Sequence, residues 1–344
     1  MNKIAIEECL QRCQQAVLLD VRSPVEFRAG HVPSAKNLPL FEDEERAEVG
    51  LCYRKEGKEA ALLLGLDVVG PKMRSLVERA KAYAQGREVL LMCSRGGMRS
   101  SSVAWLLEQA GISVKVVADG YKAFLRWREK MFLHSLKIVV LYGKTGVGKT
   151  DLIAELSARG EQVIDLEALA HHKGSAFGGI GECPQPTPAQ FENMLAIALS
   201  TLDLQRRIWV EGESRMVGKC VIPLLFWRQM QTAPYILLRR NTETRIDRLC
   251  KDYRMASNED LKQALHNISK RLGREKIQQA LQALSVESRD RFAAICLMYY
   301  DRQYDRAEEK RNGAPVMDID LDAQPQVEAV EILKNLKVSW SSIE

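Results

Sequence analysis

The segment IVVLYGKTGVGKT, residues 138–150, decides the fold of the second half of the chain. Its apolar run at 138–143 predicts a buried strand, and the helical pattern of KTDLIAELSARG follows the loop directly. The intervening Gly-x4-Gly-Lys-Thr spacing is typical of a loop whose backbone N–H groups cradle phosphate at a helix N-terminus. The sequence therefore predicts a phosphate loop made of Gly143, Lys144, Thr145, Gly146, Val147, Gly148, Lys149 and Thr150.

The side chains of this loop and of two later strand ends have predicted chemical roles. Lys149 would reach terminal phosphate oxygens, and Thr150 would ligate Mg²⁺. A metal or a general base also needs carboxylates, and four follow the apolar runs of VIDLE and RIWVEGESR. They are Asp165, Glu167, Glu211 and Glu213. These carboxylates either hold Mg²⁺ or act as bases, or they only cap helices and pair on the surface; no metal site is certain.

Short apolar runs alternate with helical patterns on both sides of the phosphate loop. The predicted strands lie at 16–23, 87–93, 114–120, 138–143, 161–166, 207–213, 235–239 and 314–319. Such alternation predicts α/β folding around parallel sheets. We expect a first domain at 1–134, with a linker helix at 121–134, and a phosphate-loop domain at 135–344 whose part from 242 to 312 is helical and strongly charged.

The composition is typical of a soluble globular protein. The 344 residues are 46% apolar and 28% charged, and 50 basic against 45 acidic residues give a net charge of +5. Eight scattered cysteines without a Cys-x-x-Cys pair predict free thiols in a reducing cytoplasm. The N-terminus has no signal-peptide core, and no apolar run is long enough to span a membrane.

A second anion-binding loop is predicted in LLMCSRGGMRSSS, residues 90–102. Cys93 ends an apolar strand just before a helix start, where backbone N–H groups and the helix dipole lower a thiol pKa and hold an anion. The loop residues are Ser94, Arg95, Gly96, Gly97, Met98 and Arg99. Ser100 to Ser102 are expected to cap the helix. Two chemistries fit: transfer of sulfur or selenium through Cys93, or phosphate ester hydrolysis, since Cys93 and Arg99 have the Cys-x5-Arg spacing of cysteine phosphatases.

The segment LLDVRSPVEFRAGHVPSAKNLPL, residues 18–40, resembles the N-terminal signature of the rhodanese family. With Cys93 it makes a match over about residues 1–130. The resemblance implies that Asp20, Arg22 and Glu26 organise the floor and rim of the cysteine loop. The loop is one residue longer than is usual in that family, which favours a phosphate-bearing donor and leaves phosphatase chemistry open.

Two basic helical segments suggest a nucleic-acid partner. Arginine and lysine are concentrated in residues 237–255 and 267–279. Cations grouped on helices either bind RNA or DNA phosphates or form a solvated face among acidic residues. Tyr253, Tyr299, Tyr300 and Tyr304 are expected to pack helices rather than stack on bases.

Taken together, CSRGGMRS, GKTGVGKT, DLEALAHHKGSAFGG and WVEGESR, in this order, resemble the tRNA 2-selenouridine synthase family over essentially the whole chain. The resemblance implies that the 2-thio sulfur of a wobble uridine is replaced by selenium, through S-geranylation from geranyl diphosphate and then selenation from selenophosphate. The partner would be the tRNA anticodon arm. The alternatives are a small-molecule kinase or phosphatase-like enzyme fused to a sulfur-carrier domain, and a tRNA-binding module without catalysis.

Overall fold

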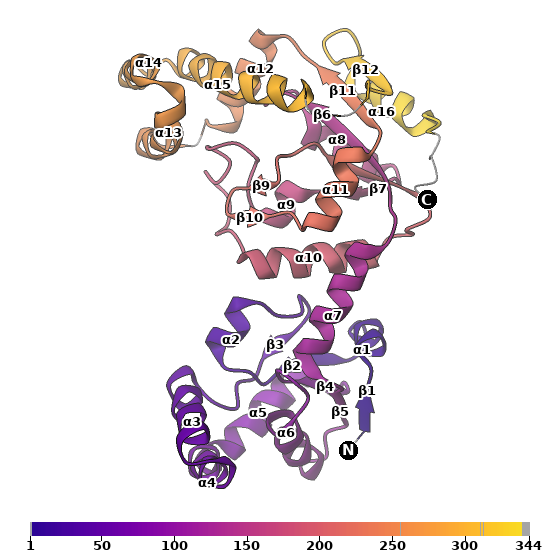
Figure 1. Cartoon of the computed structure of the whole chain (residues 1–344), viewed down its shortest axis with the longest axis vertical. Coiled ribbons are helices and arrows are strands. Elements are labelled where there is room, and N and C mark those ends of the chain that lie inside the picture. The colour runs from indigo at the N-terminus through magenta and orange to yellow at the C-terminus, as the bar shows by residue number, and fades with distance from the viewer. Residues whose placement is uncertain (1, 255, 310, 312, 339–344) are drawn as a thin grey trace. The chain divides into compact units, whose positions relative to one another are not determined.

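The computed structural model describes residues 2–254, 256–309, 311 and 313–338 and contains two compact units (Figure 1). One unit comprises Met1–Met131 with Glu192–Ile197, and the other comprises Phe132–Phe191 with Ala198–Glu344. Helix α7 (Gly120–Leu133) lies at the junction between their sequences, where the sequence suggested a linker helix at 121–134. The predicted α/β class with parallel sheets is confirmed in both units.

The first unit is built on a parallel sheet of five strands in the order β1-β5-β4-β2-β3. These strands are β1 (Asn2–Ile4), β2 (Val17–Asp20), β3 (Lys36–Asn37), β4 (Val89–Met92) and β5 (Val114–Val117). Sequence reasoning missed β1 and β3, because three and two residues are too few to show a pattern. Asp20 pairs in register with Met92, so the ends of β2 and β4 bring Asp20 beside Cys93.

Helices cover both faces of this sheet, because the strands are apolar on both. They are α1 (Ile6–Arg12), α2 (Pro24–Ala29), α3 (Asp43–Lys55), α4 (Lys58–Val69), α5 (Met73–Ala84) and α6 (Met98–Gln109), with the short 3-10 turn η1 (Gly70–Lys72) and α7. Within β4, Leu91 belongs to one buried cluster, whereas Leu90 and Met92 belong to the other. This alternation follows the two-residue period of a strand and explains the continuous apolar run.

The second unit has its own parallel sheet, in the order β12-β11-β6-β8-β7. These strands are β6 (Lys137–Gly143), β7 (Gln162–Ile164), β8 (Arg207–Glu211), β11 (Tyr235–Arg239) and β12 (Met317–Asp320). A separate antiparallel pair joins β9 (Met216–Val217) to β10 (Cys220–Val221). Leu141 in β6 is in register with Glu211 in β8, so the phosphate loop and Glu211 leave the sheet at the same edge.

The helices of the second unit include a bundle formed by the charged part of the chain (Figure 1). They are α8 (Lys149–Ala158), α9 (Leu166–Ala170), α11 (Leu224–Thr232), α12 (Thr242–Asp252), α13 (Asn258–Leu272), α14 (Arg274–Ser285), α15 (Arg289–Glu309) and α16 (Gln326–Asn335), together with the two ends of α10 (Pro188–Ser200), whose residues Glu192–Ile197 belong to the first unit. Helices α13 to α15 share one apolar cluster that includes Tyr299 and Tyr300. In the described part of the chain, no helix is long and apolar enough to cross a bilayer.

Candidate functional site

Cys93 lies directly after β4, at the base of a loop that leads into α6. Its thiol is 3% exposed and accepts a hydrogen bond from the Ser100 hydroxyl at 3.2 Å. The backbone N–H groups of Arg95, Gly97 and Ser100 also point at the sulfur. The thiol thus occupies the floor of a ring of donors, which suits a thiolate or an anion placed above it.

The electrostatics of this ring favour the ionised thiol. Burial raises the pKa of Cys93, but the Ser100 hydroxyl and the three backbone donors outweigh burial, so the pKa lies below its ordinary value. The thiolate is the nucleophilic form of cysteine. The geometry therefore suits a nucleophilic Cys93.

Two glycines make the close approach of this loop possible. Gly96 has φ +60°, and a Cβ there would lie 2.7 Å from the Val117 carbonyl oxygen. Gly120, at the start of α7, has φ +54°, and its Cβ would overlap the Cys93 carbonyl oxygen. Tyr121 N–H donates to that carbonyl at 2.8 Å, which ties the loop to α7. The sequence identified Gly96, but nothing near Gly120 showed that this glycine supports the cysteine loop.

The predicted support residues form two charged pairs. The Asp20 carboxylate and the Arg22 guanidinium pair at 2.6 Å in a buried position, and Arg22 also donates to the Gly30 carbonyl at 2.8 Å. Glu26 accepts from Arg99 at 2.6 Å, so this arginine is held by a carboxylate rather than free. Glu26 thus braces the rim of the loop through Arg99, whereas Arg22 ties Asp20 to the Gly30 carbonyl and stacks over the Tyr121 ring.

The remaining loop residues face different surroundings. Ser94 is half-buried, with its carbonyl oxygen accepting from Lys122 N–H at 3.1 Å. Gly97 is the residue before the first turn of α6. Arg95 and Met98 are exposed, and no described residue forms an ion pair with Arg95. Arg95 is therefore an exposed cation without an ion-pair partner among the described residues.

The expected capping role of Ser100 to Ser102 is wrong. Helix α6 begins at Met98, three residues earlier than a cap at Ser100 would require, so these serines lie inside its first turns. Ser102 donates to the Met98 carbonyl at 2.9 Å, whereas Ser100 turns toward the thiol. Sequence reasoning thus missed Ser100 as part of the site, although a hydroxyl in the first turn after the loop is a usable signal.

The phosphate loop has the strand–loop–helix geometry that its spacing predicts. It runs from Gly143 at the end of β6 to Lys149 at the start of α8, and Gly146 and Gly148 both have positive φ. A Cβ on Gly143 would lie 2.8 Å from the Leu238 carbonyl oxygen. The backbone carbonyl of Thr145 accepts a hydrogen bond from the Arg245 guanidinium at 3.2 Å, and the Val147 side chain is buried in the core. The backbone is thereby held in the curled form that presents N–H groups to an anion.

Lys149 lies almost fully buried at the centre of this site. Its Nζ donates to the Gly143 carbonyl at 3.1 Å and to the Tyr304 hydroxyl at 3.4 Å, and it lies 3.6 Å from Glu213 Oε1. Burial lowers the pKa of Lys149, but the Tyr304 oxygen and the neighbouring glutamates reverse this effect and raise it above its usual value. Lys149 is therefore a fixed cation facing the loop.

Of the four predicted carboxylates, three are buried around Lys149 and Thr150. Glu167 accepts from the Thr150 hydroxyl at 3.1 Å, and Glu211 lies 3.4 Å from Glu167 N–H. Burial and Glu213 raise the pKa of Glu167 to about 8, and burial likewise raises the pKa values of Glu211 and Glu213. Such groups suit proton transfer near neutral pH.

Asp165 has a different position from the other three carboxylates. Its Oδ1 accepts from Ala168 N–H at 2.7 Å, so it caps the N-terminus of α9. Burial raises its pKa, while the backbone donors of Ala168 and Glu167 oppose that rise. The structure therefore gives Asp165 the helix-capping role that the sequence left open.

The glycine-rich loop that contains Gly174, Ala176 and Phe177 packs against the buried carboxylates. Gly174 has φ +65°, and a Cβ there would overlap Glu213 and lie 2.7 Å from Glu167 Oε1. Ala176 N–H donates to the Tyr300 hydroxyl at 2.7 Å, and Phe177 is buried in the apolar cluster of α13 to α15. The helical bundle thus holds this loop in place, a link that no sequence pattern revealed.

Helix α15 supplies residues to the phosphate loop that sequence reasoning missed. Tyr304 contacts Lys149, and Asp301 binds Arg245 through two hydrogen bonds at 2.8 and 2.7 Å. Lys144 pairs with Asp305 at 2.8 Å. Tyr253, Tyr299 and Tyr300 pack in the bundle as expected, but Tyr304 belongs to the site.

A pocket of about 420 Å³ adjoins the phosphate loop. It is lined by Gly143, Lys144 and Val147 of the loop and by the ends of β11 and α15. This volume lies in the range of roughly 300–1,000 Å³ that is usual for small-molecule sites. The phosphate loop can therefore hold a ligand with a substantial group beyond its phosphates.

The donors around Thr150 fit Mg²⁺ held mainly by substrate phosphates. Magnesium typically takes one or two protein carboxylates and completes its shell with phosphate oxygens and water. Thr150 and Glu167 provide such oxygens, and the buried Oε1 of Glu211 has no hydrogen-bond partner among the described residues. Across the same residues, no group of three or more His, Cys, Asp or Glu side chains is placed to hold a metal by itself.

Comparisons with known proteins match both units. The family model described as tRNA 2-selenouridine synthase AAA domain matches residues 136–329, and the rhodanese-like domain model matches residues 6–127. The tRNA 2-selenouridine synthase of Bordetella petrii is 38% identical, over 83% of this chain and 85% of that protein. The synthase of Hahella chejuensis is 35% identical, over 86% of this chain and 86% of that protein. The synthase of Cupriavidus pinatubonensis is 36% identical, over 86% of this chain and 89% of that protein.

Proposed function

This chain belongs to the tRNA 2-selenouridine synthase family, and we propose that it replaces the 2-thio sulfur of a wobble uridine in tRNA with selenium. The family resemblance inferred from the sequence is confirmed, and the chain is an enzyme of tRNA modification. The observation that carries the proposal is a cysteine with a lowered pKa in an anion-binding loop, in a chain that also holds a complete phosphate loop.

In the first step that we propose, the uridine sulfur attacks C1 of geranyl diphosphate and diphosphate leaves. The diphosphate would sit against the backbone of residues 143–148, with its developing charge balanced by Lys149. The position of Lys149 Nζ, 3.1 Å from the Gly143 carbonyl, supports this role. Mg²⁺, where bound, would be held by Thr150 and Glu167 and would offset charge on the diphosphate.

In the second step, selenium from selenophosphate attacks C2 of the uridine and geranyl thiol leaves; water then takes the phosphoryl group as phosphate. The phosphate oxygens of the donor would bind the backbone N–H groups above Cys93, with Arg95 as the exposed cation of the loop. Arg99 would act through its pair with Glu26 as a brace of the loop. Cys93 would orient selenophosphate at the floor of the loop.

Nucleoside analysis tests this proposal directly. The protein is incubated with 2-thiouridine tRNA, geranyl diphosphate and selenophosphate, and the nucleosides are analysed by mass spectrometry. We expect S-geranyl and 2-seleno products; the absence of both would refute the function. Cys93→Ala should abolish selenation and spare geranylation, whereas Lys149→Ala should impair geranylation. Cys183→Ala, at an exposed cysteine, is the matched control and should retain both steps.

The pocket beside the phosphate loop supports a second candidate function. Its volume of about 420 Å³ would also accept a nucleotide or another small molecule. The chain would then be a small-molecule kinase or phosphatase-like enzyme joined to a sulfur-carrier domain. Turnover of ATP without tRNA, stimulated by a metabolite, would favour this alternative; the proposed synthase should show no such turnover.

A further inference from the structure

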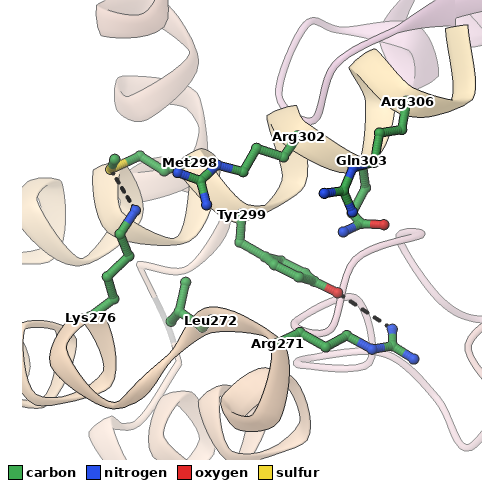
Figure 2. Close-up of a pocket in the computed structure, with 8 residues that line it drawn as sticks. All are labelled: Arg271, Leu272, Lys276, Met298, Tyr299, Arg302, Gln303 and Arg306. Atoms are coloured by element: carbon green, nitrogen blue, oxygen red, sulfur yellow. Dashed lines mark hydrogen bonds between the residues drawn. The ribbon is translucent and has the colours of Figure 1, made fainter. Parts of the chain in front are cut away.

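A second, smaller pocket lies in the helical bundle, between α13, α14 and α15. Four basic side chains line it: Arg271, Lys276, Arg302 and Arg306. Figure 2 shows them around Tyr299, whose hydroxyl accepts from Arg271 at 3.4 Å. None of the described residues that line this pocket is acidic. The pocket is therefore a local concentration of positive charge, which requires an explanation beyond packing.

The basic side chains of this pocket lack acidic partners. The ammonium of Lys276 donates to the sulfur of Met298 at 3.8 Å. Lys276, Arg302 and Arg306 form no ion pair with any described residue. The two aspartates that precede Arg302 and Arg306 on α15 are engaged elsewhere, since Asp301 pairs with Arg245 and Asp305 with Lys144. The charge on the pocket face is thus unneutralised within the described chain.

Helical periodicity explains how one helix presents two different faces. Met298, Arg302 and Arg306 recur every four residues and share a face, while Asp301, Tyr304 and Asp305 turn toward the phosphate loop. At 3.6 residues per turn, these faces lie about a third of a turn apart. The basic pocket is therefore distinct from the phosphate-loop site, although both use α15.

The size of the pocket limits its ligand. Its volume is about 80 Å³, well below the roughly 300–1,000 Å³ of typical small-molecule sites. Such a space fits a single phosphate group rather than a whole nucleotide. Arg302 and Arg306 are also exposed, so they can reach further phosphates of the same chain. This combination suits a repeating phosphodiester backbone, in which one phosphate seats in the pocket and its neighbours meet the surrounding arginines.

We propose that this basic pocket binds the phosphodiester backbone of the tRNA substrate, as a docking site separate from both anion-binding loops. The inference rests on the proposed function, because it takes tRNA as the substrate. Contacts of this kind position an RNA without reading its bases. Lys276, Arg302 and Arg306 are thus positioning residues for the tRNA, while Tyr299 is the buried wall against which a phosphate seats.

Salt-dependent binding of labelled tRNA tests the proposal. Arg302→Gln, Arg306→Gln and Lys276→Gln should each weaken binding roughly twofold to fivefold, as expected for exposed charge pairs. Each should also reduce the slope of log affinity against log salt by about one unit. The triple variant should lose on the order of tenfold to a hundredfold. Arg291→Gln removes the same charge from an exposed position of α15 outside the pocket and should leave affinity and slope unchanged.

The outcomes separate this inference from the proposed function. If the wild-type protein binds tRNA and the folded triple variant binds it equally well, the docking site is refuted and the function stands. If the wild-type protein binds no tRNA, the proposed function itself fails. Inorganic phosphate should compete no better than chloride at matched ionic strength; displacement of tRNA at low phosphate concentration would instead indicate a free-phosphate site and overturn the assignment.

Discussion

The hydroxyl of Ser100 is expected to control the reactivity of Cys93. It donates to the thiol at 3.2 Å from a fully buried position, and it is the largest influence that lowers the pKa of that cysteine. A hydrogen bond to a charged group contributes ~1.5–3 kcal/mol, and one pKa unit corresponds to ~1.4 kcal/mol. Because sulfur is a weak acceptor and three backbone donors remain, Ser100→Ala should raise the pKa of Cys93 by about one unit.

Peptide-resolved alkylation with iodoacetamide across a pH series measures this change. The midpoint for Cys93 should move upward, and its rate near neutral pH should fall, because the thiolate is the reactive form. Cys13 serves as an internal reference, since its hydrogen bond with Cys9 lowers its pKa to about 7 in the same unit. Ser102→Ala is the matched control, because that hydroxyl donates to the Met98 carbonyl. An unchanged Cys93 midpoint in Ser100→Ala would refute the reasoning and assign the pKa to the backbone donors alone.

Two further predictions concern stability. The pKa of Glu167 is raised from 4.5 to about 8, so between these pH values the folded chain keeps a proton that the unfolded chain releases. The contribution of protonated Glu167 to the free energy of unfolding is therefore complete below pH 4.5 and is lost as the pH rises toward 8. Glu167→Gln should flatten this decline in urea unfolding, and an equally steep decline would contradict the assignment. Gly86→Ala, with nothing within 4 Å of the new Cβ, should cost only the left-handed penalty of ~1–2 kcal/mol. Gly120→Ala, which collides with the Cys93 carbonyl, should cost more and slow alkylation of Cys93; equal losses would argue against the clash.

The parts of the site that lie at strand ends could be predicted from the sequence. Cys93 follows β4, Gly143 ends β6 and Glu211 ends β8, and parallel strands place such residues at one edge of a sheet. Apolar runs reveal where strands end, so local sequence alone was sufficient. The same reasoning failed for β1 and β3, because their pairing depends on the partner strands β5 and β2 rather than on their own few residues.

The residues that sequence reasoning missed reach the site through tertiary packing. Tyr304 contacts Lys149 across 155 positions, and Arg245 contacts Thr145 across 100. Their helices are amphipathic, but periodicity shows only that a helix buries one face, not which loop that face meets. Asp165 illustrates the converse case, because an acidic residue at the start of a helix suits both a cap and a ligand, and only the contact with Ala168 N–H decides between them.

Helix α15 connects the two sites proposed for the second unit. On one face, Tyr304 and Asp305 contact Lys149 and Lys144, and Asp301 holds the arginine that donates to Thr145. On another face, Arg302 and Arg306 line the basic pocket. A phosphate seated in that pocket would therefore restrain the helix that also positions the phosphate loop. If so, tRNA should protect backbone amides of residues 143–150 from hydrogen exchange in the wild-type protein. In the pocket variants at saturating tRNA, the same protection should weaken, whereas equal protection would show that the two faces of α15 act independently.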